Sequence, residues 1–206
     1  MTEPSFFSLP EACRRLYAQG LVHGCAGNVS ERSGSDMRIT ASGASFESLQ
    51  ESDVTVVSLT APEQGQVATP RPSSEWRVHR AIYLANPRIS AIVHAHPTYA
   101  TAFSVAGESM ETPFLSEMIA LLGPIPLLPF EPPGSQALAD ALGHCLQDHH
   151  GALLANHGVF SVGTSLQEAF MRMTLIEAQA KTLIYARQLG APRPLTPDQL
   201  AQMAPC

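Results

Sequence analysis

The chain has 206 residues, with 12 Lys and Arg against 18 Asp and Glu, and its formal net charge is -6. This length can bury a core within one domain, and an acidic chain without a basic cluster excludes a dedicated nucleic-acid or anionic-membrane surface. No stretch approaches the roughly 18 apolar residues of a membrane span, and the first residues lack the pattern of a secretory leader, so we expect a cytoplasmic protein.

Helices and short strands alternate along the whole sequence. Serines mark several helix starts: Ser8 and Ser165 are each followed three residues later by Glu, and Ser73 or Ser74 is the expected N-cap of a helix that ends at Asn86-Pro87. In chain order, the predicted elements are a helix over 9–19, strands over 37–40 and 53–59, a helix up to 86, a strand from 89 to 96, a helix over 99–105, a helix or turn over 116–122, a helix over 136–147, strands over 152–155 and 160–162, and a helix over 166–189.

The alternation continues without an internal repeat or an interdomain linker. We therefore expect a single domain over residues 1–206, with its core at about 9–190 and a proline-rich tail over 191–206 that contains one short turn from Thr196.

Three histidines form the most informative pattern. His94 and His96 lie two residues apart at the end of an apolar run, so on a strand both side chains point to the same face. His157 follows a second apolar run in the same way, within Asn156-His157-Gly158. Three neutral imidazoles with an open position are typical of a catalytic zinc site. The sequence therefore predicts a metalloenzyme, and of the other histidines only His79 is expected near the site.

A carboxylate and three turns of small residues accompany these histidines. Glu75 is expected in the first turn of its helix, where it could serve as a base beside the metal or as a simple partner of the helix dipole. The turns Gly27-Asn28, 40–43 and Ser73-Ser74 offer glycines, hydroxyls and a helix start, which can hold an anion without lysine. Ordinary turn chemistry would explain any one of them alone.

Lysine and cysteine chemistry is not expected to contribute. Lys181 is the only lysine and lies within a long amphipathic helix pattern, whereas Schiff-base chemistry needs a desolvated lysine beside its substrate. The four cysteines are scattered without a CxxC pair and are interpreted as reduced and structurally incidental: Cys13, Cys25, Cys145 and Cys206.

In order and spacing, these motifs resemble those of the class II aldolase/adducin family, nearest to its L-fuculose-phosphate aldolase branch, over roughly residues 9–190. The segments that carry the resemblance are Gly27-Asn28-Val29-Ser30, Thr40-Ala41-Ser42-Gly43, Pro72-Ser73-Ser74-Glu75-Trp76-Arg77, His94-Ala95-His96-Pro97 and Asn156-His157-Gly158. The resemblance implies a three-layer α/β/α domain around a mainly antiparallel sheet, assembled as a homotetramer with active sites between subunits.

The resemblance also implies roles for individual residues. His94, His96 and His157 would bind Zn²⁺, although Mn²⁺, Co²⁺ or Fe²⁺ stays open because imidazole suits several metals. Glu75 would transfer the proton. The positions that match the family's phosphate site are Asn28, Ser42, Gly43, Ser73 and Ser74.

The implied reaction is that of a lyase of carbohydrate metabolism. It would cleave a ketose 1-phosphate, similar to fuculose 1-phosphate, reversibly to dihydroxyacetone phosphate and an aldehyde, through an enediolate that the metal stabilises. One position departs from the branch: Glu117 stands where a tyrosine from the neighbouring subunit serves the aldehyde end. Either Glu117 takes over that acid/base role, or the substrate differs, or Glu117 is an ordinary surface residue.

Membership of the family leaves other activities open, because a shared fold is weak evidence about chemistry. The alternatives are a dehydratase of the methylthioribulose-1-phosphate type, a pentulose-phosphate 4-epimerase, a sugar-acid-phosphate decarboxylase and a non-catalytic adducin-like interaction module. The presence of both Glu75 and Glu117, together with all three histidines, favours the aldolase.

Overall fold

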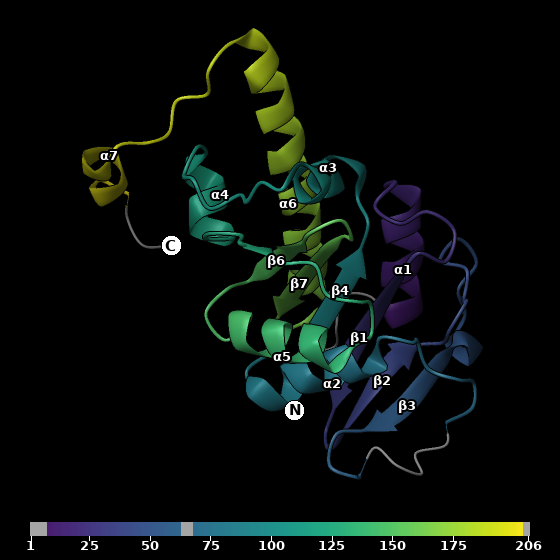
Figure 1. Cartoon of the computed structure of the whole chain (residues 1–206). Coiled ribbons are helices and arrows are strands. Elements are labelled where there is room, and N and C mark those ends of the chain that lie inside the picture. The colour runs from purple at the N-terminus through teal and green to yellow at the C-terminus, as the bar shows by residue number, and fades with distance from the viewer. Residues whose placement is uncertain (1–7, 63–67, 204–206) are drawn as a thin grey trace.

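A sheet forms the middle layer of the structure, a computed structural model that describes residues 8–62 and 68–203 (Figure 1). Its strands are β1 Gly27–Ser33, β2 Asp36–Thr40, β3 Val54–Ser58, β4 Ala91–Ala95, β5 Leu127–Leu128, β6 Gly151–Leu154 and β7 Val159–Gly163. Their order is β3-β2-β1-β4-β7-β6-β5. Every neighbouring pair is antiparallel except β5 with β6. The expected mainly antiparallel sheet is therefore confirmed.

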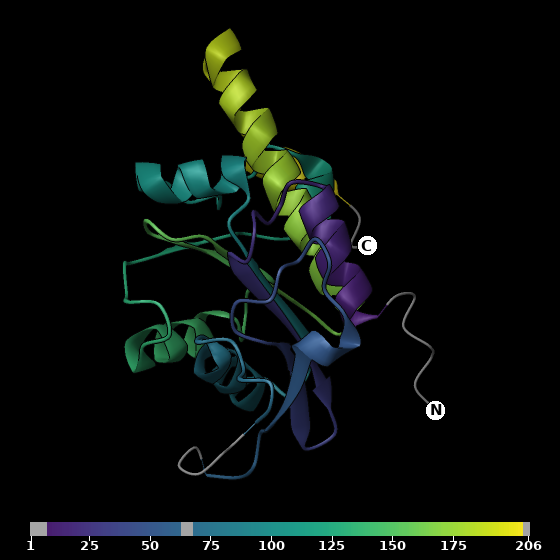
Figure 2. The same cartoon turned by 90° about the vertical axis from the view of Figure 1, so that its right-hand side faces the viewer.

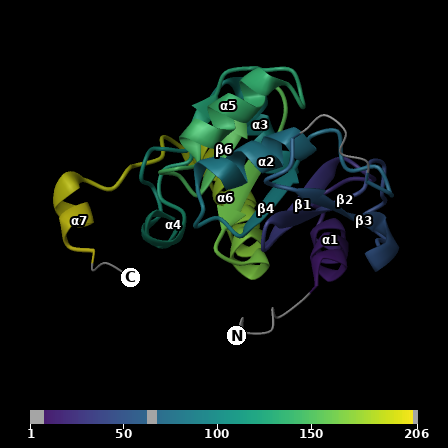
Figure 3. The ribbon, with the colours of Figure 1, turned by 90° about the horizontal axis from the view of Figure 1, so that it is seen from below.

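Helices cover both faces of this sheet. The helices of the described chain are α1 Leu9–Ala18, α2 Trp76–Ala85, α3 Thr98–Ala106, α4 Ser116–Leu121, α5 Gln136–Cys145, α6 Leu166–Leu189 and α7 Pro197–Ala201, with a 3-10 turn, η1, at Glu51–Asp53. Helices α1 and α6 lie on one face and α2 and α5 on the other (Figures 2 and 3). The three-layer α/β/α architecture is confirmed. Within the described residues, no helix is both long and apolar enough to cross a membrane.

The alternation of side chains along β4 divides the core into two parts. Val93 belongs to the buried cluster that contains Met173 of α6, whereas Ile92 belongs to the cluster that contains Ile82 of α2. Because successive strand residues face opposite sides, His94 shares the α2 side with Ile92. The strand therefore places an imidazole against the start of α2.

Most of the predicted helix starts are confirmed, and one is wrong. Ser8, Ser135 and Ser165 cap α1, α5 and α6 by accepting a backbone N–H. Neither Ser73 nor Ser74 caps α2, where Glu75 occupies the N-cap position without a side-chain cap bond.

The reason lies in the backbone before α2. The N–H of Ser73 donates to Thr40 O at 3.0 Å, and the N–H of Ser42 donates to Arg71 O at 2.9 Å. This pairing keeps residues 71–73 against the end of β2, so the helix starts later than its serines suggest. The carboxylate of Glu75 is left to face the sheet.

The cysteines behave as expected where the structure describes them. Cys13 and Cys145 are buried, Cys25 is exposed, and all three are free thiols. Cys206 lies outside the described residues.

A carboxylate of α6 fixes the position of α3, which begins directly after His96 and Pro97. Glu177 accepts the N–H of Tyr99 at 3.0 Å with Oε1 and the N–H of Ala100 at 2.8 Å with Oε2. These N–H groups belong to the first turn of α3, where the helix itself provides no acceptor. Glu177 therefore ties α6 to the chain that leaves the histidine strand.

Glu177→Gln is expected to lower the free energy of unfolding by about 1–3 kcal/mol, because an amide replaces one of two charge-assisted acceptors with a donor. Urea unfolding of the metal-free protein, followed by circular dichroism, measures this change. The matched control is Glu11→Gln, which breaks the exposed i,i+4 pair with Arg15 and should cost at most about 0.5 kcal/mol. Equal losses in the two variants would show that Glu177 does not anchor α3.

Candidate metal centre

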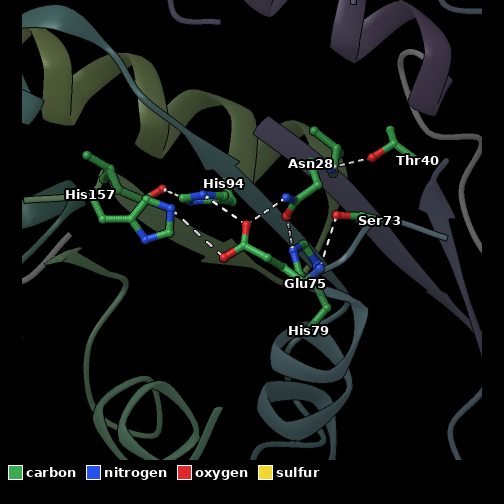
Figure 4. Close-up of polar contacts among 9 residues, drawn as sticks. Asn28, Thr40, Ser73, Glu75, His79, His94 and His157 are labelled. Atoms are coloured by element: carbon green, nitrogen blue, oxygen red, sulfur yellow. Dashed lines mark hydrogen bonds and ion pairs between the residues drawn. The ribbon is translucent and has the colours of Figure 1, made fainter. Parts of the chain in front are cut away.

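Three histidines from separate parts of the chain meet at one end of the sheet. His94 lies within β4, His96 follows the end of β4, and His157 lies in the turn between β6 and β7. Each offers one ligand atom, and these atoms all lie within 4.8 Å of one another. Antiparallel pairing of β4 with β7, which sets His94 opposite Phe160, brings the segments together. The arrangement of His94 and His157 is visible in Figure 4.

His94 is held rigidly on both sides. Its Nδ1–H donates to Val159 O at 3.0 Å, so Nε2 is the nitrogen available to a metal. The ring of Phe160 stacks on the imidazole, with ring centroids 4.2 Å apart and planes 18° from parallel. A second-sphere carbonyl and a stacked ring of this kind orient an imidazole for coordination.

The donor set fits a divalent metal. Among the described residues, no group makes a hydrogen bond with the buried Nε2 of His96, the buried Nδ1 of His157 or the buried Oε1 of Glu75. Burial, with His94 and His157 nearby, lowers the pKa of His96 to about 4, and burial also lowers the pKa of His157. Neutral imidazoles with unused nitrogens are the donors that zinc and its neighbours prefer.

The close approach of the β6–β7 turn to His96 requires glycine at position 158. A Cβ atom on Gly158 would lie 2.2 Å from Cδ2 of His96 and 2.7 Å from the carbonyl oxygen of Ala95. Asn156, two residues earlier, has a φ of 56°, a left-handed conformation that Asn tolerates better than most residues. The Asn-His-Gly motif thus sets the turn as well as supplying a histidine.

Glu75 faces the histidines from the start of α2. Its side chain is buried, with Oε2 3.2 Å from Nε2 of His94 and Oε1 4.0 Å from Nε2 of His157. Nδ2 of Asn28 donates to Oε2 at 2.9 Å (Figure 4). Burial alone would raise the pKa of this carboxyl, but the neighbouring His94 and the hydrogen bond from Asn28 outweigh it, so the pKa lies well below its usual range. Glu75 is therefore a carboxylate.

Two of the three turns predicted to hold an anion, 40–43 and Ser73-Ser74, lie side by side. An isolated bridge pairs Ala41 with Pro72, and the hydrogen bonds of Ser42 and Ser73 noted above continue it. Ser42, Gly43 and Ser74 are exposed there, whereas Asn28 and Ser73 are buried. Gly43 has a φ of 78°, a conformation that glycine adopts without strain.

The side chain of Asn28, which matches a phosphate-holding position of the family, also binds two groups of the protein. Its Oδ1 lies 2.5 Å from Nε2 of His79, and its Nδ2 donates to Glu75. One N–H of the amide is left for a ligand.

Glu117 lies apart from the histidines within one chain. It is exposed in the first turn of α4, and none of the hydrogen bonds or ion pairs of the described residues joins it to the site. His79, by contrast, is fully buried next to Asn28. The sequence places His79 near the site but gives no sign of its hydrogen-bond partners, because these come from a distant strand.

The chain matches the family model of the class II aldolase and adducin N-terminal domain over residues 8–184. An L-fuculose phosphate aldolase of Methanococcus maripaludis is 34% identical over 169 residues, which cover 82% of this chain and 90% of the relative. A 5-methylthioribulose-1-phosphate/5-deoxyribulose-1-phosphate aldolase of Escherichia coli is 33% identical over 159 residues, covering 76% of this chain and 72% of the relative.

Solved structures agree with these relatives. YgbL of Klebsiella pneumoniae, for which aldolase, epimerase and decarboxylase activities have been suggested, superposes with a TM-score of 0.85 at 31% identity and covers 95% of both chains. An L-fuculose 1-phosphate aldolase superposes with a TM-score of 0.83 at 31% identity, covering 94% of this chain and 91% of the other. A shared fold, extensive sequence identity and the family's own model over most of the length lead to one conclusion: the chain belongs to the class II aldolase and adducin N-terminal domain family.

Proposed function

We propose that the protein is a metal-dependent aldehyde-lyase that cleaves a ketose 1-phosphate of the fuculose 1-phosphate type to dihydroxyacetone phosphate and an aldehyde. The observation that carries this proposal is a buried carboxylate, Glu75, set against three histidines whose unused nitrogens gather within 4.8 Å. The names of the relatives support it, since they are aldolases of phosphorylated sugars.

The three histidines would hold the metal. A divalent ion bound by His94, His96 and His157 would supply Lewis-acid stabilisation of the negative charge that develops on substrate oxygens. Zn²⁺ suits three imidazoles, and Mn²⁺, Co²⁺ and Fe²⁺ are the other candidates.

Glu75 would move the proton. In cleavage it returns a proton to the substrate carbon from which the aldehyde has departed, and in condensation it removes that proton. Oε1 is the better placed oxygen for this step because Oε2 already accepts the N–H of Asn28.

The paired turns would hold the substrate phosphate. Ser42, Gly43 and Ser74 are exposed, backbone hydrogen bonds at Ser42 and Ser73 join their two turns, and one N–H of the Asn28 amide is not used by Glu75. Backbone and hydroxyl donors at a helix start can hold a phosphate without a lysine.

The aldehyde end would depend on a second copy of the chain. Because Glu117 is exposed on α4 and, within the described residues, makes no hydrogen bond or ion pair with the site, we assign its acid/base role to the site of a neighbouring subunit. This is consistent with a homotetramer that has interfacial active sites.

A second candidate substrate is favoured by one observation. The Escherichia coli relative named for 5-methylthioribulose 1-phosphate and 5-deoxyribulose 1-phosphate is almost as similar as the fuculose-phosphate enzyme. Either substrate would release the same dihydroxyacetone phosphate, so the reaction is shared and only the aldehyde differs.

We expect the metal-loaded protein to release dihydroxyacetone phosphate from one or more members of a panel of ketose 1-phosphates, including fuculose 1-phosphate and 5-deoxyribulose 1-phosphate. A coupled glycerol-phosphate dehydrogenase assay measures the product, and chelator-treated protein is the control. Loss of water from methylthioribulose 1-phosphate, or epimerisation of a pentulose phosphate, without triose phosphate would overturn the aldolase assignment in favour of the dehydratase or the epimerase.

Glu75→Gln should lower kcat by about 100-fold or more while metal content stays near that of the wild type, because the amide can neither return nor remove the proton. Steady-state kinetics and elemental analysis measure the two quantities. Glu117→Gln in the same assay tests the aldehyde end and should reduce kcat as well. If Glu75→Gln turns over at the wild-type rate, Glu75 is not the base.

Gly158→Ala should weaken metal binding by about 10- to 100-fold, because the new methyl group displaces the His96 ring. Competition against a chromophoric chelator measures the affinity. Gly143→Ala is the matched control: its Cβ would meet neighbours at no less than 3.6 Å, and its helical position should favour alanine by about 0.5–1 kcal/mol. An unchanged affinity in Gly158→Ala would remove His96 from the proposed ligand set.

A further inference from the structure

A continuous row of hydrogen bonds runs behind Glu75, between β1 and α2. It passes from Tyr83 through Ser30, His79 and Asn28 to the carboxylate. The distances are 2.8 Å from Tyr83 OH to Ser30 Oγ, 2.7 Å from Ser30 Oγ to His79 Nδ1, 2.5 Å from His79 Nε2 to Asn28 Oδ1 and 2.9 Å from Asn28 Nδ2 to Glu75 Oε2. Figure 4 shows the part that joins His79, Asn28 and Glu75.

Hydrogen-bonding chemistry fixes which atom donates at each contact of this row. The assignment begins at Glu75. A carboxylate only accepts, so the Asn28 atom that faces it must be the NH₂ group, and its Oδ1 must face His79. Oδ1 is itself an acceptor, so Nε2 of His79 must carry a proton. The reverse orientation of the amide would set Oδ1 of Asn28 against the carboxylate of Glu75, two acceptors facing each other.

His79 completes the assignment. Burial, with Glu75 opposing and His94 adding to the effect, lowers the pKa of His79 to about 3, so the ring carries one proton near neutrality. With that proton on Nε2, Nδ1 is an acceptor and takes the hydroxyl proton of Ser30. Ser30 then accepts from Tyr83, whose pKa burial raises well above its usual range. Every donor in the row points towards Glu75.

The row ends inside the protein. Tyr83 is only 1% exposed, and Arg32 covers its ring, with Cζ 4.9 Å from the centroid. A row that ends at a buried phenol has no exchange with solvent, so its function is to hold a group in place. His79 itself is held by Phe160, whose ring meets it edge-on with centroids 5.7 Å apart.

We propose that His79 is a positioning residue for the proton-transferring carboxylate. As the neutral Nε2–H tautomer it fixes the amide of Asn28, which binds Oε2 of Glu75 and leaves Oε1 turned to the substrate. The two oxygens of Glu75 thereby have different functions. The kinetic part of this inference rests on the proposed function, whereas the tautomer of His79 does not.

The kinetic test compares His79→Phe with His79→Gln in the full-length, metal-loaded protein. Phenylalanine keeps a ring but removes the donor, so kcat should fall by about 10- to 100-fold while KM and metal content change by less than about 2-fold. Glutamine, whose amide can still donate to Asn28, should recover most of that loss. His144→Phe, at an exposed histidine of α5, is the matched control and should leave all three quantities unchanged.

Two kinetic outcomes would overturn the proposal. One is a His79→Phe protein with wild-type kcat. The other is an equal loss in both variants that follows their metal content or folded fraction, since that would indicate a purely structural role.

A spectroscopic test decides the matter even if the phenylalanine variant does not fold or the wild type has no aldolase activity. Long-range ¹H–¹⁵N spectra of wild-type protein at neutral pH report which imidazole nitrogen is protonated. A single proton on Nε2 of His79 supports the proposal, and a proton on Nδ1 or on both nitrogens overturns it. Absence of activity on every ketose phosphate, with this tautomer present, would contradict the proposed function and leave the orientation of Glu75 supported.

Discussion

The register between β1 and β4 is the constraint on which the rest of the site depends. It sets Asn28 opposite His94 and Ser30 opposite Ile92, so the polar residues of β1 share the face of the sheet that α2 covers. Helix α2 and its N-cap place Glu75, His79 and Tyr83 against these residues. The three recur every four residues on one side of the helix. Four helical residues advance about 6 Å and two strand residues about 6.6 Å, so the two rows stay aligned. A slip of one residue would turn Asn28 and Ser30 to the opposite face.

This arrangement carries polar groups through a layer that is otherwise apolar. Buried donors and acceptors are costly when unpaired and strengthen one another when every member is satisfied. Every member of the row from Tyr83 to Glu75 makes at least one hydrogen bond to the next, and the row ends at the carboxylate that faces the histidines. Among the described residues, the site itself contains four buried side-chain atoms without a hydrogen-bond partner: Oε1 of Glu75, Nε2 of His94, Nε2 of His96 and Nδ1 of His157.

Local sequence signals predicted the outline of the fold and the histidine cluster. The spacing of His94 and His96 on a strand, and the serine caps of α1 and α6, depend on neighbouring residues, so they could be recognised without a structure. The start of α2 could not, because the pairing of residues 71–73 with the end of β2 overrides the preference of serine for the N-cap.

The partners of His79 escaped prediction for a related reason. The apolar residues of α2 give a clear helical face. The partners of the polar residue His79, which lies beside that face, become known only when β1 is placed against the helix. The role of Glu117 could not be predicted for another reason. Within the described residues, it makes no hydrogen bond or ion pair with the site of its own chain. No pattern within one sequence specifies what a second copy brings.

The β6–β7 turn affects how a metal would bind to the three histidines. Backbone pairing of β4 with β7, together with the glycine that admits His96, gathers the three imidazoles. Metal capture would therefore require little ordering of the chain, unlike in small zinc domains that fold only around their ion. The fold that gathers the ligands is thus that of the sheet itself, which is supported by a buried hydrophobic cluster on each face.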